Sequence, residues 1–170
     1  MKNSEWVEKY FEKVAQSSAE GKEAVEYVRT RKVNVGMKRA RKNVGAFWTL
    51  TGSFFLNSVH YTKESALENP RAWTLFVHEV RHLQQGIITA LSIYGELDAW
   101  KVEFELYKKL TGKKLPPVVE ELISLPLNMD RENLQHACDL MMQYSGKGYL
   151  ANLLPLYPIH KEIRYWVTRS

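Results

Sequence analysis

The sequence predicts an α+β fold, in which a small antiparallel sheet is flanked by helices and followed by a helical C-terminal part. Two observations lead to this prediction. Apolar residues recur every three to four positions over most of the chain, as in helices that bury one face. Only between Val33 and Ser58 does the period change to two, which is typical of strands. Helices and strands therefore occupy separate stretches, as in an α+β architecture.

The strand-forming stretch lies between two helical regions. Before it, the spacing of apolar residues predicts helices over residues 4–16 and 18–30. Within it, alternation predicts three strands in an antiparallel meander, with turn residues between them, over residues 33–38, 46–50 and 53–58. After it, the helical period returns, and Pro and Gly residues suggest where the helices begin and end. We expect these helices over residues 70–86, 88–110, 117–124, 131–145 and 159–167.

The size and composition are those of one globular domain, expected to span residues 1–170. Hydrophobic residues make up 45% and charged residues 25%, both ordinary values. No apolar run reaches the length of a membrane span, and the first residues do not read as a secretory signal. Cys138 has no partner for a disulfide and lies in the apolar stripe of its helix, which favours a core residue in a reducing compartment. We therefore expect a cytoplasmic protein without a membrane partner.

Seven of the 24 basic residues fall between Arg29 and Lys42, and the net charge is +5. Such a cluster can bind nucleic acid or an acidic ligand. No zinc finger, RNA-recognition signature or helix-turn-helix pattern accompanies it. A solvated strand face is the favoured interpretation, and nucleic acid is the least favoured partner.

The most informative motif is His78-Glu79-Val80-Arg81-His82 within the helix predicted over 70–86. Residues four apart lie on one face of a helix, so His78 and His82 can bind one metal ion. Glu79 lies beside the pair, where it can take a proton from a metal-activated water. Two exposed histidines on a solvated face are the alternative. The motif therefore predicts a zinc site with Glu79 as general base.

A catalytic zinc normally has three protein ligands, and no histidine follows His82 until His136. A carboxylate on the next helix is expected instead. If the two helices are antiparallel, the histidine pair lies about 9 Å before the turn and Glu96 about 12 Å after it, at 1.5 Å per residue. Glu103 lies about 10 Å further along. Glu96 is therefore the predicted third ligand, chosen from the acidic residues Glu96, Asp98, Glu103 and Glu105.

These residues resemble the gluzincins, a clan of zinc metallopeptidases. Their zinc ligands are the two histidines of a His-Glu-x-x-His helix and a glutamate on the next helix. The segment Glu96-Leu97-Asp98-Ala99 is similar to the E-x-x-A segment around that glutamate in compact, minigluzincin-like members. The resemblance implies a zincin-like active-site helix followed by a glutamate-bearing helix, with zinc bound by His78, His82 and Glu96. Trp100 stands where larger relatives carry an acid that supports the zinc site.

A second resemblance lies upstream. Gly45-Ala46-Phe47-Trp48 is similar to the edge strand of thermolysin-like enzymes, which binds an extended peptide, although Gly45 replaces an asparagine. An unpaired strand edge offers backbone N–H and C=O groups to a peptide of any sequence. The resemblance therefore implies a peptide or protein substrate contacted by Gly45, Ala46, Phe47 and Trp48. An interior strand is the alternative.

Together these features predict a zinc metallopeptidase, a hydrolase in which zinc lowers the pKa of bound water and Glu79 removes its proton. A catalytically inactive, zinc-stabilised peptide-binding module and a non-peptidase metallohydrolase remain alternatives, because a metal motif does not identify the bond attacked. An oxyanion stabiliser is also expected. The C-terminal candidates, each also a candidate packing residue, are Tyr144, Tyr149, Tyr157, His136 and His160.

Overall fold

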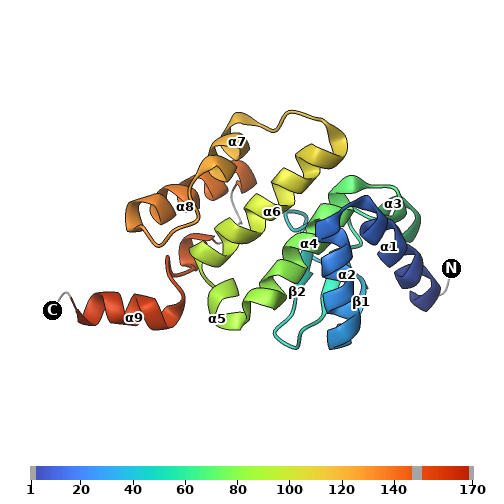
Figure 1. Ribbon diagram of the computed structural model, residues 1–170, viewed down its shortest axis with the longest axis horizontal. Helices are drawn as coiled ribbons and strands as arrows, with labels where there is room; N and C mark the ends of the chain where they lie inside the picture. The colour runs from blue at the N-terminus through green and yellow to red at the C-terminus, as the bar shows by residue number, and fades with distance from the viewer. Residues whose placement is uncertain (1–2, 147–150, 169–170) are drawn as a thin grey trace.

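The structure is a computed structural model that describes residues 3–146 and 151–168 (Figure 1). Two helices open the chain, α1 (Asn3–Ser17) and α2 (Ala19–Arg31). The side chain of Ser18 caps α2 by accepting a hydrogen bond from the Gly21 amide. Both helices match the expected ranges to within a residue or two, because a buried apolar stripe and a capping residue are local signals.

Three short strands form a mixed sheet rather than the antiparallel meander that the sequence predicted. They are β1 (Val35–Lys38), β2 (Ala46–Trp48) and β3 (Phe54–Asn57), in the order β1-β3-β2. β2 and β3 are antiparallel, whereas β1 and β3 are parallel. The prediction was wrong because it paired consecutive strands: β3 lies between β1 and β2, and the connection from β1 to β2 crosses to the other side of it.

Asn57, which is fully buried at the end of β3, holds that connection in place. Its side-chain amide donates hydrogen bonds to the carbonyls of Arg41 and Val44, at 2.8 and 2.6 Å. Its side-chain oxygen accepts from the amides of Ala40 and Val59, at 3.0 and 3.1 Å. One side chain thus satisfies four backbone groups that no strand partner pairs, as buried polar groups require.

The middle of the chain forms α3 (Lys63–Leu67), α4 (Pro70–Gln85), α5 (Ile87–Ala90) and α6 (Ile93–Thr111). Residues 88–110 were expected to form one helix, but Leu91 and Ser92 separate α5 from α6. The Ser92 hydroxyl accepts from the Gly95 amide at 3.1 Å and donates to the Thr89 carbonyl at 2.6 Å. A Cβ at Gly95 would lie 2.1 Å from the Thr89 carbonyl oxygen, so this close approach requires glycine.

The C-terminal part is helical, as expected, with α7 (Pro117–Ser124), α8 (Arg131–Ser145), a 3₁₀ turn η1 (Ala151–Leu153) and α9 (Ile159–Val167). Asp130 caps α8 by accepting from the Asn133 amide. Lys101 of α6 donates to the carbonyls of Ile123 and Leu125 where α7 ends, which ties the two helices together.

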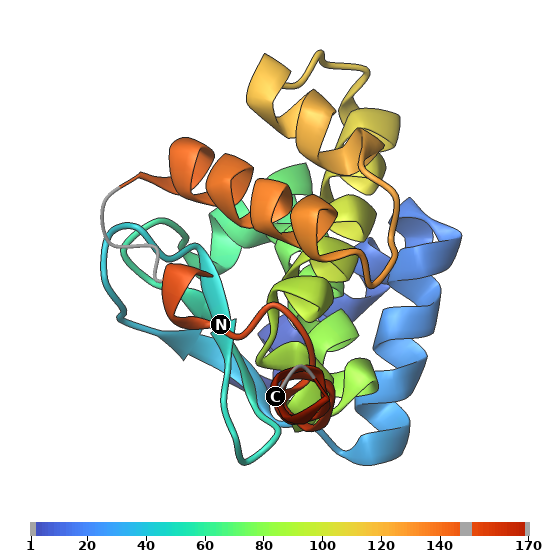
Figure 2. The same ribbon diagram turned by 90° about the vertical axis from the view of Figure 1, so that its left-hand side faces the viewer.

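Two hydrophobic clusters meet along the α4–α6 pair. One joins α1, α2, the sheet and α4, and the other joins α6, α7 and α8. Figures 1 and 2 show α4 and α6 side by side in the middle of the molecule, with the strands on one side and α8 on the other. In the part of the chain that the structure describes, no helix is both long and apolar enough to cross a membrane. The α4–α6 interface carries the predicted site.

Candidate metal centre

The three predicted ligands converge between α4 and α6. His78 and His82 are buried one turn apart on α4, with their Nε2 atoms 3.0 Å apart. Glu96 lies in the first turn of α6, where its Oε1 is 3.5 Å from the Nε2 of His82. The ligand atoms of all three lie within 4.8 Å of one another. The turn at Gly86 and the break before α6 therefore place Glu96 level with the histidine pair.

The donor set fits a divalent transition metal. Two imidazole nitrogens and one carboxylate oxygen are typical ligands of catalytic zinc. Ligand atoms about 2.1 Å from a tetrahedral ion lie about 3.4 Å apart, close to the separations found here. The residues present therefore fit a metal held by two imidazoles and one carboxylate.

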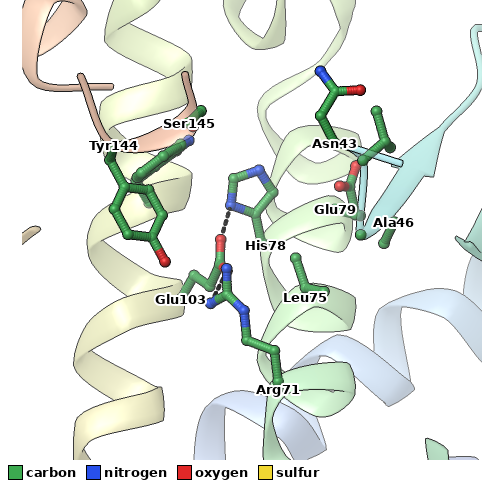
Figure 3. A pocket seen from close by; sticks show the side chains of 12 residues that line it. Asn43, Ala46, Arg71, Leu75, His78, Glu79, Glu103, Tyr144 and Ser145 are labelled. Atoms are coloured by element: carbon green, nitrogen blue, oxygen red, sulfur yellow. Dashed lines mark ion pairs between the residues drawn. The ribbon is translucent and has the colours of Figure 1, made fainter. Parts of the chain in front are cut away.

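Glu103, which the sequence analysis did not choose as a ligand, contacts His78. Its Oε2 lies 2.7 Å from Nδ1 of His78, whereas the Nε2 of the same ring faces His82. Glu103 also forms an ion pair with Arg71 (Figure 3). Burial alone would lower the pKa of His78, but Glu103, through its charge and its contact with the ring, and the charges of Glu79 and Glu96 together outweigh it and raise that pKa to about 9. Burial would likewise raise the pKa of Glu103, but Arg71 and His78 hold it below its ordinary value.

Such a carboxylate fixes the orientation and tautomer of a metal-binding imidazole. Glu103 thus places an acid against His78, whereas Trp100 offers none. A signal was present in the sequence: Glu103 follows Glu96 by seven residues, which places both on one face of α6.

His82 has its own support. Its Nδ1 lies 3.3 Å from Oε1 of Gln85, and the amide of Gln85 donates to Asp98 at 2.7 Å. Arg81 also donates to Asp98, at 2.7 Å through Nε. Burial lowers the pKa of His82 to about 4, so this imidazole is neutral around pH 7, whereas His78, with its pKa of about 9, would have to release a proton to bind a metal. Asp98 is therefore occupied by Arg81 and Gln85, and Glu105 is exposed on another face of α6.

Glu79 is buried beside the three ligands, next to β2. Burial raises its pKa to about 7, and the neighbouring carboxylates of Glu96 and Glu103 act in the same direction. A hydrogen bond from the Trp48 backbone amide and the charge of His78 oppose this shift. A carboxylate with a pKa near the working pH is well suited to accept a proton and return it.

Strand β2 is the edge of the sheet on the side of Glu79. The Asn57 amide donates to the Gly45 carbonyl and the Thr49 amide to the Ser53 carbonyl, both at 2.9 Å. Hydrogen-bonded and non-hydrogen-bonded pairs alternate in an antiparallel ladder, so Gly45 and Phe47 direct their backbone groups toward β3. The backbone groups of Ala46 and Trp48 point outward, and the Trp48 ring lies 6.1 Å from that of His82.

A cavity of about 210 Å³ extends from this edge along His78 and Glu79 to Tyr144 of α8. Figure 3 shows Tyr144 across the cavity from Glu79 and Ala46. Among the expected oxyanion stabilisers, Tyr144 is therefore placed beside the site. Tyr157 packs on Tyr165, and Tyr149 lies outside the described residues. The histidines are elsewhere: His136 pairs with Glu121, and His160 is exposed on α9.

The structure thus brings His78, Glu79, His82 and Glu96 together at one end of β2. Glu103, Gln85 and Arg81 complete the surroundings and had not been assigned a role from the sequence. No protein-family model matches this chain, and no curated protein sequence or solved structure shows significant similarity to it. Function is therefore inferred from the residues of the site and their geometry.

Proposed function

We propose that this chain is a zinc-dependent peptidase of the compact gluzincin type, with a zincin-like arrangement of its active-site helix. The observation that carries the proposal is the convergence of His78, His82 and Glu96 beside a buried Glu79. Bound by these three residues, zinc would supply a Lewis acid that lowers the pKa of water toward about 7. Buried Cys138 is compatible with a reducing compartment, and we place the activity in the cytoplasm.

Glu79 acts as the general base. It accepts the proton of the attacking water and returns it to the leaving amine. The Trp48 amide donates to the carboxylate, and burial raises its pKa to about 7. The hydroxyl of Tyr144, across the cavity, is the candidate to stabilise the oxyanion.

A peptide is favoured as substrate because the site lies beside β2, an outer strand of the three-stranded sheet, whose largely buried Ala46 lines the cavity. The outward N–H and C=O groups of Ala46 can pair with an extended peptide, whose backbone would then run past Glu79. Trp48 contributes less, because its amide is already hydrogen bonded to Glu79. This edge distinguishes the proposal from a metallohydrolase that acts on a small molecule.

Hydrolysis by the zinc-loaded protein tests the proposal. The protein is incubated with a mixture of unstructured peptides, and new amino termini are counted by mass spectrometry. Glu79→Gln should retain zinc and lose at least about 100-fold in rate, the lower range for a general base. Glu105→Gln on the exposed face of α6 is the matched control and should keep full activity. Absence of hydrolysis by the wild type, with zinc bound, would leave the inactive peptide-binding module instead.

A further inference from the structure

Two neighbouring cavities lie beside the site. The first is the cavity beside His78 and Glu79, and the second, of about 280 Å³, lies toward the loop that follows α6. They share Arg71 and Tyr144 as lining residues. A peptide that runs past Glu79 in this direction would therefore reach the second cavity within a few residues.

The second cavity is lined by cations and aromatic rings, without a carboxylate. Its cations are Arg71, Lys113 and Lys114, and its rings include those of Tyr107 and Tyr144. Both lysines are exposed, and no ion pair to either ammonium group is found among the described residues. The two lysines therefore remain available to an anion in the cavity, since the nearby Glu120 pairs with Lys108.

Arg71 lies between the two cavities and lines both. Its guanidinium stacks over the ring of Phe104, 4.7 Å from the centroid, and its side chain keeps 31% of its exposure. Its partner Glu103 is shared with His78, so one carboxylate faces two basic groups. The Phe104 ring and Glu103 thus hold the guanidinium in place; its Nη1 is buried, while about a third of the side chain stays exposed and the residue lines both cavities.

Lys113 and Lys114 line the same cavity as Arg71. They lie in the loop between α6 and α7, which begins with the C-cap Gly112 and ends at the buried Leu115. The Thr111 side chain accepts from the Lys113 amide, and the Leu115 amide donates to Glu120. A short loop anchored at both ends restricts where Lys113 and Lys114 can move.

We propose that Arg71, Lys113 and Lys114 form a carboxylate-binding subsite for the part of the peptide that lies beyond the scissile bond. This subsite rests on the proposed peptidase function and assigns it a substrate class, peptides that carry a carboxylate a few residues from the cleaved bond. That carboxylate is either an Asp or Glu side chain or the C-terminus of a short peptide.

Binding, measured without cleavage, tests the subsite. Zinc-loaded Glu79→Gln is titrated with three labelled pentapeptides of one sequence: neutral and C-terminally amidated, with Glu in place of Gln near the C-terminus, and with a free C-terminal carboxylate. We expect one or both carboxylate peptides to bind about fivefold to tenfold more tightly than the neutral one, as two partly exposed ion pairs allow. About 0.5 M salt should reduce this preference, because the cations are exposed.

The arms of the experiment identify the source of the carboxylate, since preference for the Glu peptide indicates a side chain and preference for the free acid indicates a C-terminus.

The preference should disappear in Lys113→Ala/Lys114→Ala. It should persist in Lys22→Ala/Lys161→Ala, a control with the same change of net charge at exposed positions outside both cavities. No binding, equal binding of all three peptides, or a preference that survives Lys113→Ala/Lys114→Ala would overturn the proposal.

Failure of the peptidase function would be seen separately. If the wild type binds the carboxylate peptides preferentially but hydrolyses none of them, the subsite stands and the chain is a binding module. If it hydrolyses peptides without regard to their charge, the peptidase function stands and the subsite is refuted.

Discussion

Replacement of Glu103 probes how the site is held together. This carboxylate is buried, contacts Nδ1 of His78 at 2.7 Å and pairs with Arg71. Glu103→Gln keeps an oxygen for the imidazole but removes the charge, whereas Glu103→Ala removes both. Loss of a residue that orients a metal ligand costs 10- to 100-fold in metal affinity. We therefore expect zinc to bind about 10-fold more weakly in Glu103→Gln and toward 100-fold more weakly in Glu103→Ala, about 1.4 and 2.7 kcal/mol.

Glu103→Ala should also lower the stability of the protein without zinc. Removing one partner of a buried ion pair costs about 3–5 kcal/mol. Arg71 keeps 31% of its exposure, so water can solvate it in part, and the free energy of unfolding should fall by about 1–3 kcal/mol. Chelator competition measures the zinc affinity, and urea unfolding measures the stability.

Glu105→Ala, on an exposed position of the same helix, is the control for both measurements. If Glu103→Ala binds zinc as tightly as Glu105→Ala, Glu103 does not support His78 and the reasoning fails. If zinc binding is lost completely, Glu103 is itself a ligand, and Glu96 has been assigned wrongly.

Three further outcomes are expected. Glu96→Ala should weaken zinc binding by more than 100-fold and Asp98→Ala by less, measured by chelator competition; the reverse order would contradict the ligand assignment. Ala46→Pro should abolish peptide binding and keep its zinc, because the Ala46 N–H points away from β3. Its ring must fit at a buried position, so some loss of stability is expected, but the free energy of unfolding should fall less than in Phe47→Pro, which also loses a ladder hydrogen bond worth about 1 kcal/mol; an equal or larger loss in Ala46→Pro would show that its amide is paired. Gly95→Ala should lower the thermal midpoint, because its Cβ would meet a carbonyl at 2.1 Å, and an unchanged midpoint would refute that packing.

The helices and the convergence at their centre could be predicted because their signals are local. The i,i+4 spacing of His78 and His82 puts both on one face, and a turn at Gly86 reverses the chain. Counting the rise per residue then placed Glu96 opposite the pair. Even the missed break between α5 and α6 preserved this result, since the resumed helix still directs Glu96 toward His82.

The sheet and the supporting groups depend on contacts between distant parts of the chain. A turn-like segment before β2 suggested a hairpin, but the buried side chain of Asn57 binds that segment and lets β3 pair in parallel with β1. Nothing near Asn57 in the sequence indicates this role. Glu103 was missed for another reason: its distance along α6 excluded it as a ligand, and although its seven-residue spacing from Glu96 puts both on one face, that spacing does not show that it reaches Nδ1 of His78.

The most direct test of the central claim is an anomalous diffraction map, recorded at the zinc absorption edge, from crystals of the zinc-loaded protein. We predict one peak per chain, about 2.0–2.2 Å from Nε2 of His78, Nε2 of His82 and a carboxylate oxygen of Glu96, with Glu79 uncoordinated beside it. A peak bound by other residues, or less than about 0.2 zinc per chain after repletion, would contradict it.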